Sequence, residues 1–227
     1  MLGVTEVSEY FGLYKSTVHN ILSTLKAMEY LEQDEETGKY RLGIQIFNLS
    51  KALGDTYSIT KIAGPYMQEL SNYTGERCYL AVPYRQEVLY LDAMYPADSI
   101  ELMRSILGER AQMHCTGLGK AMLANMGERE ISDYLEHHKL EAFTENSIID
   151  KKQFREELLR TKQRGYALDD MEHEFGIKCI AMPVFDRTKN VYAAISISGM
   201  ANHFTDANIA EWAMLLKKYI RKIESRL

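Results

Sequence analysis

The first 42 residues contain two short helical patterns, a glycine turn between them and a hairpin pattern after them. Apolar residues recur at helical spacing over 4–11, and Gly12 is typical of a helix end. A second helical pattern begins at Lys15 and keeps its apolar residues on one face. The strand-like runs 30–33 and 39–42 then flank a polar turn that contains a glycine. This order of elements predicts a winged helix-turn-helix.

Polar side chains suited to DNA contacts gather on the second helical pattern and on the hairpin. The second helix of such a unit enters the major groove, so its outward side chains must reach base edges and phosphates. Serine and threonine donate to phosphate, and asparagine reads adenine through two hydrogen bonds. Short helix-turn-helix patterns also occur as plain packing units, so the pattern alone leaves both interpretations open. The candidate DNA contacts are Lys15, Ser16, Thr17, His19, Asn20, Lys39 and Arg41.

The charge balance argues against strong non-specific binding to nucleic acid. The chain has a formal net charge of -5 at pH 7. Residues 1–50 contain four Lys and Arg residues and seven Asp and Glu residues, so the predicted DNA-binding segment has a net charge of -3. Counterion release therefore contributes little affinity, and useful binding requires two or more copies acting together.

The remainder of the chain predicts an α+β domain. With 46% hydrophobic and 26% charged residues, the composition is that of a globular protein and excludes wholesale disorder. Strand pairs are predicted at 78–83 with 88–93 and at 177–185 with 191–198, among helices at 59–73, 116–125, 128–137, 151–164 and 206–225. The predicted organisation is a winged helix-turn-helix over 1–43, a linker helix over 44–58 and a second domain over 59–227.

The sequence contains no pattern typical of a membrane span, a signal peptide or a metal site. No run approaches about 18 apolar residues, and the N-terminus lacks a basic region followed by an apolar stretch, so we expect a cytoplasmic protein. The cysteines Cys78, Cys115 and Cys179 are odd in number and far apart, which suits reduced thiols and no disulfide framework or zinc ribbon. We expect neither a metal nor a cofactor.

Catalytic interpretations fail on spacing. Gly119-Lys120-Ala121 is no phosphate-binding loop, because the first glycine and the magnesium-binding hydroxyl are missing. His173-Glu174 has no second histidine at the spacing of a zinc site. His114 and Cys115 are neighbours, and on a strand they would point to opposite faces, so a nucleophilic pair would need partners elsewhere. We therefore expect no enzymatic activity.

Several motifs in order resemble the IclR family of bacterial transcription regulators. The stretches that carry the resemblance are 15–19, 30–43, 75–76, 113–121, 164–167, 176–183 and 194–199. They cover nearly the whole chain. The resemblance implies a winged helix-turn-helix followed by a GAF-like effector domain that binds a small organic acid or an aromatic molecule. It also implies a homodimer or tetramer on double-stranded operator DNA.

The resemblance also implies positions for an effector pocket. In the family the backbone amides at Gly117 and Leu118 would hold a carboxylate, and four further positions would supply polar contacts. Without the resemblance, two serines on a strand are most often a solvated edge, and a buried cysteine is a small hydrophobe. The implied polar positions are Asp169, Cys179, Ser196 and Ser198, of which the two serines share one strand face. The implied apolar wall is Ile177, with Leu102, Met103 and Ile106 as weaker candidates.

Two features depart from the family pattern. The family opens with a further helix before the segment that begins here at Gly3, so we expect a shortened start or a DNA-binding domain that is incompletely folded. Asn20 stands where the family often has arginine, which removes a cation from the DNA face, and Tyr14 stands where proline is frequent, which only loses a preset φ at the helix start. The predicted function is a ligand-responsive transcription regulator. The alternative is a small-molecule sensor or hydrolase on the same effector domain, without productive DNA binding.

Overall fold

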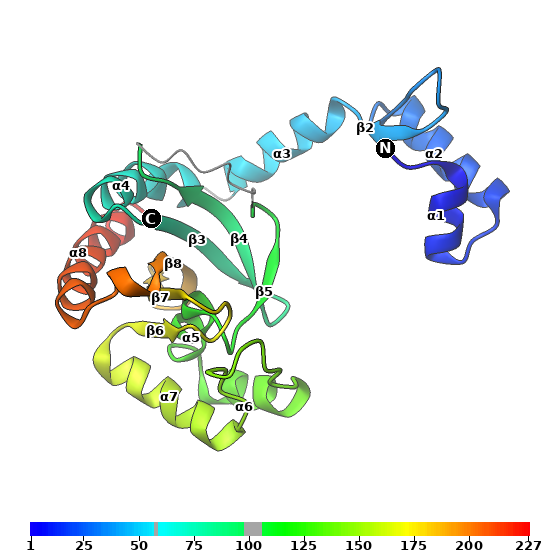
Figure 1. Cartoon of the computed structure of the whole chain (residues 1–227). Helices are drawn as coiled ribbons and strands as arrows, with labels where there is room; N and C mark the ends of the chain where they lie inside the picture. Colours follow the sequence, from blue (N-terminus) through cyan, green and yellow to red (C-terminus); the bar gives the residue numbers. More distant parts are fainter. Residues whose placement is uncertain (57–58, 98–105) are drawn as a thin grey trace. The chain divides into compact units, whose positions relative to one another are not determined.

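The computed structural model describes residues 1–56, 59–97 and 106–227, and the chain forms two compact units, Met1–Ser58 and Ile59–Leu227 (Figure 1). The predicted wall residues Leu102 and Met103 lie outside the described residues. No helix in the described ranges is long and apolar enough to cross a membrane.

The N-terminal unit has the predicted helix-turn-helix and hairpin. Its elements are α1 (Val4–Phe11), α2 (Lys15–Ala27), β1 (Leu31–Gln33), β2 (Tyr40–Leu42) and α3 (Gln45–Thr56). Val18 and Leu22 of α2 are buried with Tyr40 of β2, and apolar residues of α1 and β1 pack around them. The backbone of Leu2 pairs with that of Tyr40, which adds a third short segment to the hairpin.

Two glycines set the turns of this unit. Gly12 ends α1 with a φ of 65°, a left-handed conformation that costs glycine little. Gly43, after β2, lies so close to the preceding turn that an added Cβ would be 2.3 Å from the Glu29 carbonyl oxygen. The hairpin therefore folds back tightly before α3 begins.

The C-terminal unit is built on one antiparallel sheet of six strands in the order β5-β4-β3-β8-β7-β6 (Figure 1). The strands are β3 (Arg77–Tyr84), β4 (Glu87–Met94), β5 (Arg110–Gln112), β6 (Ala167–Asp170), β7 (Ile177–Phe185) and β8 (Val191–Met200). The helices are α4 (Ile59–Thr74), α5 (Gly117–Leu123), α6 (Glu128–His137), α7 (Lys151–Arg164), the 3-10 turn Ala201–His203 and α8 (Asp206–Glu224).

The two faces of the sheet carry different side chains. Large apolar residues such as Leu80, Ile180 and Ile195 pack on one face against α4 and α8. The other face carries Ala81 and Ala181 beside α5, with α6 and α7 outside it. Because side chains alternate along a strand, each strand supplies both cores. The small residues allow α5 to approach the sheet closely.

The sequence patterns missed the two edge strands, β5 and β6. Each has four residues or fewer, and the two aspartates at the end of β6 are disfavoured in strands. The interpretation of His114 and Cys115 as strand neighbours is wrong, because residues 113–116 form an irregular bend before α5.

Candidate functional site

A cavity of about 180 Å³ lies on the α5 face of the sheet. An engineered cavity of about 150 Å³ holds benzene, so the space suits a ligand of one ring or a few carbon atoms. Its apolar walls come from Tyr79, Tyr90, Ile106, Leu118 and Ile177. Its polar lining includes Arg77, Arg110, Thr116, Asp169, His173, Glu174, Cys179, Ser196 and Ser198.

The register of the sheet gathers the polar lining. Asp169 of β6 is paired with Cys179 of β7, which is paired with Ser198 of β8. Ser198 is in turn opposite Arg77 of β3, so four strands contribute to one row. Directly opposed residues share a face of the sheet. In the neighbouring row Ser196 lies opposite Tyr79 and is fully buried. Among the described residues its hydroxyl has no hydrogen-bond partner beyond the adjacent Cys179 thiol.

The start of α5 forms one wall of the cavity. Thr116 caps the helix by accepting a hydrogen bond from the Gly119 amide at 3.2 Å. A Cβ on Gly117 would lie 2.6 Å from the Cys179 sulfur, so only glycine fits there. The Gly117 amide faces that sulfur. The expectation that the Gly117 and Leu118 amides hold a carboxylate stays a prediction.

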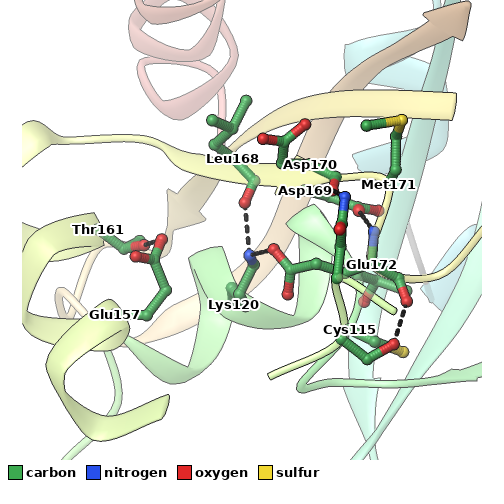
Figure 2. Close-up of polar contacts among 12 residues, drawn as sticks. Cys115, Lys120, Glu157, Thr161, Leu168, Asp169, Asp170, Met171 and Glu172 are labelled. Atoms are coloured by element: carbon green, nitrogen blue, oxygen red, sulfur yellow. Dashed lines mark hydrogen bonds and ion pairs between the residues drawn. The ribbon is translucent and has the colours of Figure 1, made fainter. Parts of the chain in front are cut away.

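Behind this wall lies a buried cluster of Lys120, Glu172 and Asp169 (Figure 2). The Lys120 ammonium is completely buried and donates to the Leu168 carbonyl and to Glu172 Oε1. The Glu172 amide donates to Asp169 Oδ1 at 2.8 Å. Glu172 Oε2 is buried and without a partner among the described residues. The ammonium therefore pairs with one of the two buried carboxyl groups, Glu172, whose backbone amide binds the other, Asp169.

The electrostatics of this cluster favour a protonated carboxyl group. Burial raises the pKa of Asp169 to about 7, against the opposing effects of its amide hydrogen bond and of Lys120. Burial also raises the pKa of Glu172, although its ion pair with Lys120 opposes this. Asp169 can therefore donate as well as accept a hydrogen bond near neutral pH.

The sulfur and imidazole groups beside the cavity are not arranged for catalysis. Cys115 Sγ lies 3.7 Å from His173 Nδ1, a partner that the sequence did not indicate. Burial raises the pKa of the Cys115 thiol to about 12, and burial lowers the pKa of His173. The thiol therefore stays protonated and is a poor nucleophile. No group of three His, Cys, Asp or Glu residues suited to a metal occurs in the described part of the chain.

All seven residues predicted for the effector pocket line this cavity, as does Ile106. The sequence reasoning missed Arg77, Tyr79, Tyr90, Arg110 and His173. These residues come from β3, β4, β5 and the loop after β6, and no local pattern marks them. They are brought together only by strand pairing.

The predicted DNA contacts lie on α2 and on β2 and its preceding turn in the N-terminal unit. The predicted contacts on α2 are all exposed, whereas Val18 and Leu22 of the same helix are buried; the exposed residues are Lys15, Ser16, Thr17, His19 and Asn20. The two hairpin cations are engaged within the unit. Lys39 pairs with Glu6 at 3.4 Å, and Arg41 pairs with Glu32 at 2.8 Å. These ion pairs reduce the positive charge that the hairpin offers to phosphate.

The chain matches two models of known families. Residues 51–225 match the bacterial transcriptional regulator IclR C-terminal family, and residues 1–35 match the IclR helix-turn-helix domain. The HTH-type transcriptional regulator XynR of Escherichia coli (strain K12) is 32% identical over 217 residues, which are 96% of this chain and 86% of that protein. The HTH-type transcriptional regulator KdgR of the same strain is 31% identical over 229 residues, covering 100% of this chain and 86% of that protein.

Solved structures share the fold. The Thermotoga maritima IclR structure superposes with a TM-score of 0.82 at 29% identity, covering 100% of this chain and 91% of that chain. An IclR transcriptional regulator from Alicyclobacillus acidocaldarius superposes with a TM-score of 0.88 at 24% identity, covering 98% of this chain and 89% of that chain. Named relatives are regulators and repressors of transcription, not enzymes.

Proposed function

The chain belongs to the IclR family of bacterial transcriptional regulators, and we propose that it binds a palindromic operator and responds to a small organic acid. The observation that supports this most strongly is the cavity on the α5 face, in which a row of polar residues from four strands faces a space of about 180 Å³. A helix-turn-helix with an exposed polar helix face precedes it in the same chain.

The proposed DNA contacts are those of the exposed α2 face and of the hairpin. Lys15 and the hydroxyls of Ser16 and Thr17 bind phosphates, and Asn20 reads base edges in the major groove. A single unit with a charge of -3 over residues 1–50 binds weakly, so the operator is occupied by a homodimer or tetramer. The helix α3 lies between the hairpin and the effector unit in sequence and transmits the ligand response.

The proposed effector contacts are the polar row and the start of α5. Asp169, Ser196 and Ser198 orient the ligand by hydrogen bonds, while Leu118 and Ile177 cover its apolar part. The test begins with a screen for small carboxylates that raise the melting temperature of the protein. Operator DNA is then titrated with the protein at low salt, with and without those carboxylates. Failure to form a specific complex would contradict it.

Replacing Ser196 by alanine should weaken effector binding at least about tenfold and leave stability nearly unchanged. In the described part of the chain the Ser196 hydroxyl has no hydrogen-bond partner of ordinary geometry, so its removal should change the free energy of unfolding by less than about 0.5 kcal/mol. Calorimetry with a carboxylate found by thermal shift, together with urea unfolding, measures both effects. Unchanged ligand affinity would refute the assignment of this cavity.

Replacing Glu32 by glutamine should tighten operator binding by about two- to tenfold. The change frees Arg41 from its surface ion pair and removes a negative charge near the hairpin, while such a pair contributes at most about 1 kcal/mol to stability. The salt dependence should steepen by about one unit of slope, because one more cation meets phosphate. Fluorescence anisotropy at several salt concentrations measures both. Glu9→Gln removes an exposed carboxylate of α1 that takes part in neither hairpin pair, and a gain as large in that variant would contradict the explanation.

A further inference from the structure

We propose that the effector is a carboxylate that binds together with one proton, which Asp169 holds and donates to the ligand in a hydrogen bond. The proposal rests on the proposed function of the cavity and specifies the charge of its ligand. Lys120 and Glu172 are the positioning residues in this arrangement. They touch Asp169 or its loop and set its protonation, without being placed against the ligand.

The arrangement begins with the buried ammonium. Lys120 lies one helical turn into α5, with no exposed surface, and its two hydrogen bonds go to the Leu168 carbonyl and to Glu172. Leu168 precedes Asp169 on β6. Lys120 thus holds a residue before Asp169 and a residue after it in the sequence, Leu168 and Glu172. Figure 2 shows the ammonium between these two partners.

The charges of the cluster do not balance when both carboxyl groups ionise. Glu172 takes the charge of Lys120, whereas Asp169 receives hydrogen bonds from neutral backbone amides, that of Glu172 at 2.8 Å and that of His173. Glu157 of α7 also faces Lys120, but it has its own cations, Arg160 at 3.0 Å and Arg164 at 3.2 Å. An ionised Asp169 is therefore a buried charge that has no cation in hydrogen-bond contact among the described residues, which is costly.

The other described groups around Asp169 do not supply the missing charge. Cys115, Cys179 and Tyr90 are neutral near pH 7, because burial raises the pKa of each of them. Arg77 lies three strands away from Asp169 in the row and donates to the Tyr79 hydroxyl, and Arg110 is exposed and pairs with Glu87 at 3.3 Å. Among the described residues, the remaining titratable groups of the cavity lining are His173, Glu109 and Glu174.

An entering carboxylate sharpens this imbalance. Two carboxylates within a few ångströms of one another do not both stay ionised in a buried site, and they share one proton instead. Burial raises the pKa of Asp169 to about 7 before a ligand arrives, so the proton is available at little cost. The bound carboxylate raises that pKa further. The ligand keeps its charge and accepts the O–H hydrogen bond from Asp169.

The linkage fixes the direction of the pH dependence. Below about pH 7 Asp169 of the free protein already carries the proton, so binding takes up almost none. Above that pH Asp169 is ionised in the free protein and protonated in the complex. Binding then takes up roughly one proton, and the dissociation constant of a carboxylate rises about tenfold per pH unit until the pKa of the complex is reached.

The test uses calorimetry on the full chain with two matched pairs of probes, benzoate with benzamide and glycolate with glycolamide. Titrations in two buffers of different ionisation enthalpy, HEPES and Tris at pH 8 and MES and Bis-Tris at pH 6, give the number of protons taken up. We expect at least one carboxylate to bind with roughly one proton at pH 8 and almost none at pH 6. Its neutral amide should bind with no proton uptake at either pH.

Two variants separate the roles of the cluster. Asp169→Asn keeps a neutral donor and should bind the carboxylate at pH 8 without taking up a proton. Glu172→Gln frees the charge of Lys120 for Asp169 and lowers the pKa of Asp169, so this variant should bind the carboxylate more weakly at pH 8 than the unaltered protein does. The matched control is Asp170→Asn, which removes the next carboxyl group on β6, one that pairs with Lys178 across the strands. It should retain the uptake.

Carboxylate binding without proton uptake in the unaltered protein would overturn the proposal, and so would tighter binding of the amides or uptake that survives in Asp169→Asn. The proposal would also be overturned if neither benzoate nor glycolate bound. Operator binding is measured separately, and its absence would instead refute the proposed function.

Discussion

Lys120→Met should lower the free energy of unfolding of the effector unit by about 3–5 kcal/mol, because breaking a buried ion pair strands the remaining charge. The stranded group is Glu172, whose second carboxylate oxygen already has no partner among the described residues. The Leu168 carbonyl also loses its donor. Urea unfolding followed by fluorescence measures the loss. The only tryptophan, Trp212 on α8, is buried against Phe204 and reports on this unit.

The pH dependence of that loss has a defined sign. A stranded Glu172 relieves its cost by binding a proton, so the deficit of Lys120→Met should be smaller at pH 5.5 than at pH 7.5. The double variant Lys120→Met with Glu172→Gln removes the stranded charge and should recover most of the stability at pH 7.5. A double variant as unstable as the single one would show that packing, not charge, explains the loss.

Gly119→Ala should destabilise the same unit by about 3 kcal/mol or more, because it forces a Cβ into the backbone of the bend before α5. The added atom would lie 2.3 Å from both the Cα and the carbonyl oxygen of Met113, which is itself buried. Neither backbone atom can move without displacing the cap formed by Thr116. Thermal and urea unfolding measure the effect.

The matched control is Gly64→Ala in α4. Its Cβ would meet only the end of the Met94 side chain, at 3.4 Å, and alanine is the better helix former by up to about 1 kcal/mol. This variant should be as stable as the unaltered protein or slightly more so. Equal destabilisation by both substitutions would contradict the assignment of a close backbone approach at Gly119.

Local patterns predicted most of the fold because they depend on neighbours in the sequence. The helices at 128–137 and 151–164 and the strand at 177–185 have the predicted bounds, since their apolar periods and end residues are regular. The edge strands β5 and β6 were not predicted, because they form strands through pairing with their neighbours and not through their composition.

The cavity was predicted only in part, for the same reason. The resemblance placed Asp169 and Cys179 in one pocket, but their pairing with Arg77 depends on the register of four strands. The sequence around Lys120 contained a signal that could have indicated the cluster. Apart from Lys120, residues 117–124 are all small or apolar, and a lysine buried in such a run needs a partner. The contact between Cys115 and His173 joins residues 58 positions apart, and no sequence pattern indicates it.

The most direct test of the central claim is the affinity for labelled DNA from the region upstream of the chain's own coding sequence, measured by fluorescence anisotropy with and without a saturating carboxylate. We expect the protein to bind this DNA in preference to an unrelated duplex, with a dissociation constant that changes at least about tenfold when the ligand is bound. We also expect Ser196→Ala to lose this response at the same ligand concentration. Equal affinity with and without a ligand that calorimetry shows to be bound, or no preference for the upstream DNA, would contradict the central claim.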